Sequence, residues 1–139
     1  MNTKTILAAL AGSVVSFLGG WVIFGMLLMD FYTANTTKYD GLMKEPMPDL
    51  LFIFLSGLAL SSLVAYIYSK WANIKTFGAG FTNGLIIYFL YACAYDLNVY
   101  GFMNLQSLTL TLSDIIAQTI FGGLVGGIIG LVLGMGKKA

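Results

Sequence analysis

The stretch IIAQTIFGGLVGGIIGLVLGMG, which runs from Ile115 to Gly136, decides the fold of this chain. In water, each glycine in a helix costs about 1 kcal/mol relative to alanine. In a bilayer the backbone must satisfy its own hydrogen bonds, so a single apolar span of this length is a helix. Four of its glycines recur every four residues and share one helix face, which favours close approach of another helix. They are Gly122, Gly126, Gly130 and Gly134.

Three other apolar segments precede this one. The four predicted spans cover residues 6–29, 50–69, 77–95 and 115–136, and each is close to the ~20 residues that cross a bilayer. Hydrophobic residues make up 58% of the 139 residues and charged residues only 9%, which is typical of an integral membrane protein. We therefore predict an all-α fold, a tight bundle of four transmembrane helices in a single domain over residues 1–139.

The charges sort by side of the membrane. With the N-terminus inside, five lysines lie in inner segments, whereas the outer loops hold all six acids and only Lys38 and Lys44. The positive-inside rule then places both termini in the cytoplasm. We interpret the first span as a retained helix, because its apolar run exceeds the roughly 7–15 residues of a signal peptide. The inner lysines are Lys4, Lys70, Lys75, Lys137 and Lys138.

Small residues at a spacing of four occur in every span, and we call these rows ridges. Such ridges favour close helix crossings. They either hold a tight bundle together within one chain or supply an oligomer interface, and both can hold together. Beside the glycine row of the fourth span, the ridges are Gly12, Ser16 and Gly20; Gly57, Ser61, Ala65 and Ser69; and Gly80 and Gly84.

The chain also has the pattern of an internal repeat. A shift of 65 residues carries Asp49 onto Asp114 and the ridge of the second span onto that of the fourth, and a shift of 66 carries Gly12 onto Gly78. Two hairpins of the same orientation would then form a parallel repeat about an axis along the membrane normal. Chance alignment of small residues is the alternative.

Four acids stand at predicted helix ends on the outer side: Asp30, Asp49, Asp96 and Asp114. If the helix ends meet, their carboxylates form a ring that attracts or binds cations. The alternative is that these acids are helix caps and solvated boundary charges. Asp49 and Asp114 stand where N-caps belong.

Polar side chains inside the spans are few. Asn83, Tyr91 and Tyr95 share one face of the third span, and Gln118 lies in the fourth. This polar face either lines a cavity or, for the tyrosines, belongs to the interfacial aromatic belt.

The residues that the chain lacks exclude several function classes. It has no histidine, so imidazole-ligated haem and most zinc or copper sites are excluded, and we predict no cofactor and no metal. Its single cysteine, Cys93, excludes an intramolecular disulfide. A net charge of +1 gives no reason to expect a nucleic-acid partner. With no catalytic motif and no intramembrane acid–base pair, we predict no enzymatic activity.

Several short segments resemble a family of small bacterial four-helix membrane proteins of unknown function, in a style similar to chains from Bacteroidota. The resemblance spans nearly the whole chain and implies a four-helix fold in the bacterial inner membrane, with no established activity. It rests on Asp30-Phe31-Tyr32, Met47-Pro48-Asp49, Lys70-Trp71-Ala72, Asp96, Tyr100-Gly101 and Asn104-Leu105.

The functional expectation follows from abundant packing surface and almost no buried reactive chemistry. We expect a non-enzymatic membrane protein that acts through helix–helix association, either as a homo-oligomer or as an accessory subunit of a membrane complex. The alternative is a small oligomeric channel or permease with an acidic outer mouth.

Overall fold

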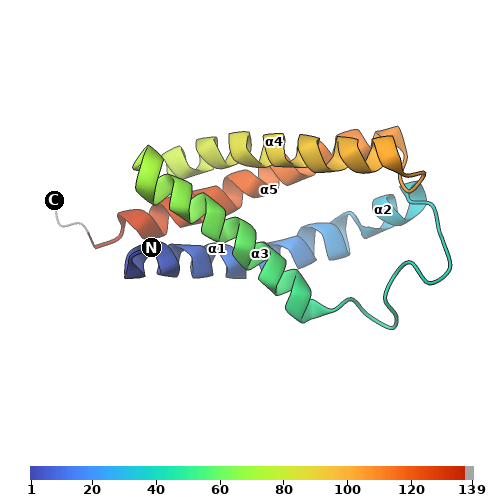
Figure 1. Cartoon of the computed structure of the whole chain (residues 1–139), viewed down its shortest axis with the longest axis horizontal. Coiled ribbons are helices and arrows are strands. Elements are labelled where there is room, and N and C mark those ends of the chain that lie inside the picture. Colours follow the sequence, from blue (N-terminus) through green and yellow to red (C-terminus); the bar gives the residue numbers. More distant parts are fainter. Residues whose placement is uncertain (137–139) are drawn as a thin grey trace.

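The computed structural model describes residues 1–136, which form an all-helical bundle (Figure 1). Four helices, taken with the π-helical turns that end two of them, are long and apolar enough to cross a membrane, which confirms the predicted class. The elements in order are α1 (Thr3–Val22), a π-helical turn (Ile23–Leu27), α2 (Met29–Asn35), α3 (Leu50–Ile67), a second π-helical turn (Tyr68–Ala72), α4 (Phe77–Phe102) and α5 (Leu108–Gly134).

The third and fourth helices are longer than predicted. Helix α4 continues to Phe102 instead of ending at Tyr95, and α5 begins at Leu108 instead of Ile115. Ser107 caps α5, since its side-chain oxygen accepts a hydrogen bond from the Leu110 amide at 3.0 Å. The boundaries of these two spans were therefore wrong, and the segment predicted as a connection is largely helical.

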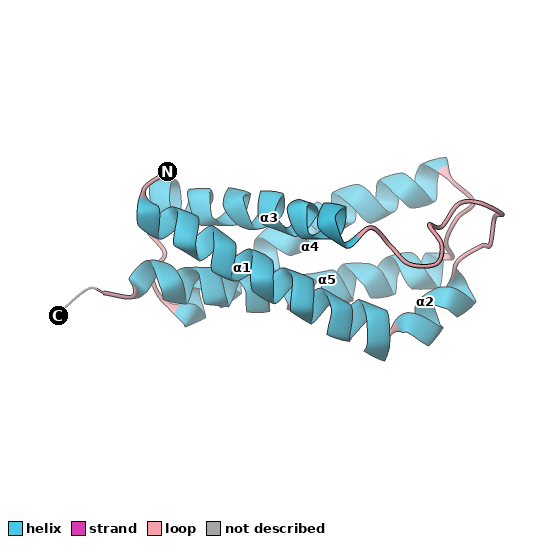
Figure 2. Ribbon diagram, turned by 90° about the horizontal axis from the view of Figure 1, so that it is seen from below, coloured by secondary structure: helices cyan, strands magenta, loops and turns pink. Residues whose placement is uncertain are grey.

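Helix α5 is the centre of the bundle. Helix α4 packs along it, α1 lies against it, and α3 packs mainly on α1 (Figures 1 and 2). Helix α3 crosses the bundle obliquely and diverges from the other long helices toward its N-terminus (Figure 1). We call the end that holds Thr3 and Gly134 the terminal end. The opposite end, with residues 28–49 and 103–107, is the loop end.

In the middle of the seam between α4 and α5, backbone packs directly against backbone. A Cβ atom added at Gly84 would lie 3.1 Å from the Gly126 Cα, and one added at Gly80 would lie 3.1 Å from the Gly130 Cα. Both distances are tighter than ordinary van der Waals contact, so only glycine allows this approach. Tyr68 supports the seam by donating a 2.6 Å hydrogen bond to the Gly80 carbonyl oxygen.

The remaining ridges also meet partners within the chain. An added Cβ at Gly12 would lie 3.1 Å from the Ser61 Oγ, and one at Gly57 would lie 3.1 Å from the Ser16 Oγ. Ala65 on the same face of α3 is fully buried. The α1–α3 hairpin is thus closed by small residues on both sides. At the edges of the ridges, Gly20 makes only ordinary contact with Phe121, and Gly134 lies under the Lys75 backbone.

The two hairpins, α1–α3 and α4–α5, have different surroundings. Gly12 is buried against α3 and α5, whereas an added Cβ at Gly78, its counterpart in the repeat, would meet no atom within 4 Å. Helix α5 contacts every other long helix, and α3, its counterpart, does not take that central place. The bundle is therefore asymmetric in its packing, and the internal repeat stays a prediction from the sequence.

Candidate functional site

The four acids that were expected to form a ring have four different surroundings. Asp30 is exposed on α2, Asp49 lies just before α3 with its carboxylate 3.7 Å from the Lys44 Nζ, and Asp114 is half-buried within α5. Asp96 lies within α4 and is only 3% exposed. Among residues 1–136, no group of three or more Asp, Glu, Cys or His side chains is arranged to hold a metal ion. The described structure therefore does not assemble the expected ring.

The alternative, helix caps and solvated boundary charges, suits Asp30, which is exposed in the first turn of α2, and Asp49, which directly precedes α3. It does not suit Asp96 or Asp114, which lie within their helices. Asp49 occupies the N-cap position of α3, but its side chain makes no capping hydrogen bond. Asp114 is not at a helix start, because Ser107 caps α5. Instead, the Asp114 carboxylate accepts a hydrogen bond from the Tyr32 hydroxyl of α2 and is also hydrogen-bonded to Gln118. Asp114 therefore ties α2 to α5.

The loop end is held together by a polar contact that we call the latch, between residues 35–39 and residues 104–107. The Ser107 amide donates to the Asn35 carbonyl oxygen at 3.0 Å, and the Ser107 Oγ donates to the Asn35 Oδ1 at 3.1 Å. The Thr37 amide donates to the Leu105 carbonyl oxygen at 2.6 Å. These bonds fix the end of α2 against the turn between α4 and α5. The Tyr39 hydroxyl adds a 2.9 Å bond to the Asn104 carbonyl oxygen.

Gln106 connects the latch to the interior. Its backbone pairs with Thr36 in an isolated antiparallel bridge, and its Nε2 donates to the Thr111 Oγ1 at 3.0 Å. Its side chain is also hydrogen-bonded to Asp96. The second carboxylate oxygen of Asp96, Oδ2, is buried and has no hydrogen-bond partner. The hydrogen bonds of the latch therefore lead through Gln106 to the Asp96 carboxyl group, which has one oxygen without a hydrogen-bond partner.

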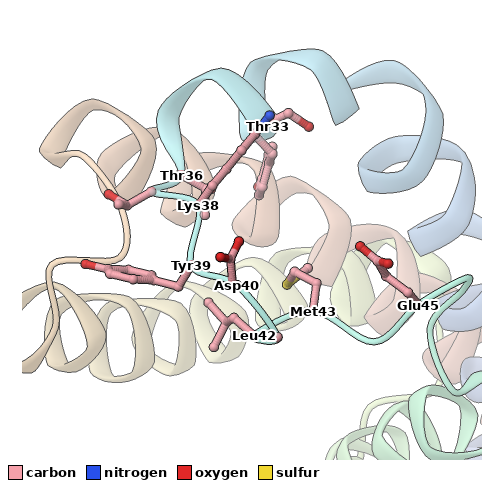
Figure 3. A pocket seen from close by; sticks show the side chains of 11 residues that line it. Thr33, Thr36, Lys38, Tyr39, Asp40, Leu42, Met43 and Glu45 are labelled. Atoms are coloured by element: carbon pink, nitrogen blue, oxygen red, sulfur yellow. The ribbon is translucent and has the colours of Figure 1, made fainter.

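Two pockets open on either side of the latch. One, of about 520 Å³, is formed by α2 and the following loop, and the charged side chains of Lys38, Asp40 and Glu45 line it (Figure 3). The other, of about 470 Å³, lies between the end of α2 and the α4–α5 turn, and it is lined by Asn35, Gln106 and other polar latch residues. Gln106 is therefore accessible from the protein surface through the second pocket.

The expected polar face does not line a cavity. Tyr91 and Tyr95 are 46% and 60% exposed, and their rings stack on each other with centroids 6.3 Å apart. Asn83 is half-buried and donates to the Ala79 carbonyl oxygen of its own helix at 2.9 Å. Gln118 is engaged elsewhere, with Asp114. This arrangement suits the alternative for the tyrosines, an interfacial belt.

The residues that the sequence reasoning missed are Tyr68, Tyr88, Gln106 and the latch pair Asn35 and Ser107. One signal for Tyr88 was present, since Gly80, Gly84, Tyr88, Ala92 and Asp96 continue a single spacing of four. All five are buried on the side of α4 that packs against α5. No sequence pattern pointed to the latch, because it joins segments about 70 residues apart.

The Ser107→Ala variant tests the latch. It removes the N-cap bond of α5 and the side-chain bond to Asn35, so we expect a loss of about 1–2 kcal/mol in stability. Thermal unfolding of the purified protein in detergent, followed by circular dichroism, measures the loss. Thr82→Ala on the exposed side of α4 is the control. Equal melting temperatures for the two variants would show that the latch contributes nothing.

Comparison of the chain with models of known protein families, with characterised proteins and with solved structures gives no match. The resemblance described above therefore stays a prediction, and the structure itself supplies the argument for function.

Proposed function

We propose that this chain is a non-enzymatic integral membrane protein that acts by binding other membrane-embedded chains, as an accessory subunit or in a homo-oligomer. The proposal places it in a bacterial inner membrane with both termini cytoplasmic. The described lysines support this orientation, because Lys4, Lys70 and Lys75 lie at the terminal end. Lys137 and Lys138 lie outside the described residues. The acidic loop end then faces outward.

The observation that carries the proposal is the isolation of α3. The N-terminal half of this helix diverges from the bundle, and its side chains are exposed on most sides (Figure 1). In its apolar window, 17% of α3 is buried, the lowest share of the four spans, compared with 22% for α1 and for α4 and 50% for α5. A helix that packs so little inside its own chain has most of its surface available to other helices. The exposed large residues are Leu50, Leu51, Phe52, Ile53 and Leu55.

The exposed side of α3 is also not uniformly bulky. Ser56 and Ala59 are exposed on it between Phe52 and Leu63. Small residues that face outward from a transmembrane helix give a second helix a place to approach closely. A serine in the same position adds a hydroxyl that a partner can bind. This side of α3 is therefore our proposed association surface.

The glycine ridges are not available to bind a helix of another chain. Gly80 and Gly84 are covered by α5, and Gly12 and Gly57 are covered by side chains of neighbouring helices. The alternative, a small oligomeric channel or permease, stays a prediction from the sequence, because a pore between copies of the chain would be lined by exposed residues such as Tyr91 and Tyr95.

The test is to extract the protein gently from its own membrane and to weigh the intact assembly by native mass spectrometry. We expect a mass above that of one chain, and the excess tells whether the partner is a second copy or another protein. A mass of one chain with bound lipid alone would contradict the proposal.

A variant of the association surface sharpens this test. Ala59→Trp places a large ring where a partner helix would approach, and we expect the assembled fraction to fall by about tenfold, equivalent to about 1.4 kcal/mol. Leu10→Trp on α1 is the matched control, because Leu10 is 43% exposed and lies away from α3's outer side. If both variants assemble as the parent does, the surface lies elsewhere.

A further inference from the structure

Three buried side chains among residues 1–136 have a polar atom without a hydrogen-bond partner: Ser61, Tyr88 and Asp96. Asp96 is the one of these three that carries a charge in water. Asp96 is only 3% exposed, and its Oδ2 is buried without a hydrogen-bond partner. Its hydrogen-bond partner, Gln106, is a neutral amide. A buried carboxylate without a compensating charge costs several kcal/mol, so such groups take up a positive charge or become neutral.

The register of the hairpin shows what surrounds this carboxyl group. Gly84 lies against Gly122 and Gly126, and Gly80 lies against Gly126 and Gly130. Continuing this antiparallel register along α4 places Asp96 beside the first turns of α5, where Thr111 is fully buried. The Gln106 side chain bonds to both Asp96 and Thr111. A carboxyl, an amide and a hydroxyl group are thus gathered at one buried point.

Among residues 1–136, the ion pair seen at the loop end joins Lys44 to Asp49, and Asp114 is engaged by Tyr32 and Gln118. The titratable groups on the elements around Asp96 are Asp114 on α5, Asp30 and Tyr32 on α2, Lys38 and Tyr39 in the latch, and Tyr88, Tyr91, Cys93, Tyr95 and Tyr100 on α4. Lys38 is the cation in this group, and it is exposed on the wall of the other pocket, the one of about 520 Å³.

The site has an approach from the surface. The pocket of about 470 Å³ between α2 and the α4–α5 turn is lined by Gln106, Tyr100 and Asn104, and Gln106 is the residue that reaches Asp96. A small ion in this pocket would be one side chain away from the buried carboxyl group.

We propose that Asp96, with Gln106 and Thr111, forms a binding site for a single positive charge at the loop end, reached through the pocket beside the latch. Gln106 faces this point with its Nε2 hydrogens, and the Thr111 hydroxyl already donates to the Ser107 carbonyl oxygen, so few oxygen atoms are free to hold a metal ion and a proton is the positive charge that fits best. A divalent ion would leave an excess positive charge buried. This site is independent of the association surface on α3.

The test compares the parent protein with Asp96→Asn, which keeps the shape of the side chain and removes its charge. Thermal unfolding in detergent is measured from pH 8 to pH 5 in choline chloride, and again at pH 8 with Na⁺ in place of choline. Asp30→Asn is the matched control, because Asp30 is an exposed carboxylate on α2 at the same end.

A proton at the site predicts that the parent is stabilised as the pH falls, by up to tenfold in the folding equilibrium per pH unit, because folding then takes up one proton. Asp96→Asn loses the part of this dependence that Asp96 contributes, and Asp30→Asn keeps all of it. Asp114→Asn measures the part that the second buried carboxyl group contributes. A metal ion at the site instead predicts that Na⁺ raises the melting temperature of the parent and of Asp30→Asn, but not of Asp96→Asn.

A second measurement needs no variant. Infrared spectra of the folded parent show a carboxylic-acid C=O band that titrates if a proton is held, and ²³Na resonance broadening reports a bound sodium ion. If Asp96→Asn responds to pH and Na⁺ as the parent does, the proposal is overturned. It is equally overturned if Asp96→Asn fails to fold and the parent shows neither spectroscopic signature.

Discussion

The Gly84→Val variant is expected to lose about 3 kcal/mol or more of stability. A Cβ at Gly84 would lie 3.1 Å from both the Gly122 carbonyl carbon and the Gly126 Cα. These are backbone atoms of a helix, so they cannot move aside as a flexible side chain would. Valine adds two methyl groups beyond this Cβ, and α4 must separate from α5 to admit them.

The measurement for this variant is thermal unfolding in detergent, together with the yield of monodisperse protein. Gly78→Val is a demanding control, since it makes the same change on the same helix, and an added Cβ at Gly78 meets no atom within 4 Å. Both variants carry the same change in helix propensity. If the two lose equal stability, the cost comes from propensity and not from the seam between α4 and α5.

The Tyr88→Ala variant is expected to lose about 3–5 kcal/mol, as large-to-small changes of buried aromatic residues do. Tyr88 is 1% exposed, its ring covers Gly122, and it packs edge-on against Phe121 at 6.3 Å between ring centroids. Removing the ring leaves a cavity between α4 and α5 at a point where both backbones are already fixed by glycine.

The Tyr88→Phe variant separates packing from polarity. The Tyr88 hydroxyl is buried without a hydrogen-bond partner, so its removal is expected to leave stability unchanged or to raise it by about 1 kcal/mol. Tyr95→Ala is the control for aromatic removal on α4, because Tyr95 is 60% exposed. Unfolding by heat in detergent measures all three. A phenylalanine variant as damaged as the alanine variant would show that the hydroxyl group has a polar role.

The four spans and the close helix packing could be predicted because both depend on local patterns. Long apolar runs define the spans, and a spacing of four defines the ridges, as Gly122, Gly126 and Gly130 illustrate. Which ridge meets which is a matter of tertiary structure. The pairing of Gly80 and Gly84 with the glycines of α5, and of Gly12 with Ser61, is not encoded in spacing alone.

The ends of α4 and α5 could not be predicted from hydropathy. The hydropathy pattern predicts helix ends at Asp96 and Asp114, because a charge is costly inside a membrane. In the structure each lies within its helix and is satisfied, at least in part, by residues distant in sequence: Gln106 for Asp96 and Tyr32 for Asp114. Long-range partners of this kind lower the cost of a polar residue, and a hydropathy pattern contains no information about them.

The sequence pattern also could not predict which tyrosines of α4 face the interior of the bundle. Tyr91 and Tyr95 share a face with Asn83, which made that face look polar and functional. Tyr88 lies on the other side, in line with Gly80 and Gly84, and this is the buried side. The small residues, more than the polar ones, mark the interior of a membrane bundle, because close approach needs them.

The central place of α5 has a consequence for how the protein is made. Synthesis proceeds from the N-terminus, so α1, α3 and α4 are made before the helix on which α4 packs. The α1–α3 hairpin can close early through Gly12 and Ser61. Helix α4 has no extensive contact with α1 or α3, so it is surrounded by lipid until α5 is made. A substitution in the glycine row of α5 therefore leaves a newly made chain with an unpartnered α4. Its first visible effect in cells is expected to be a lower amount of protein, through removal by membrane proteases, before any change in what the surviving molecules do.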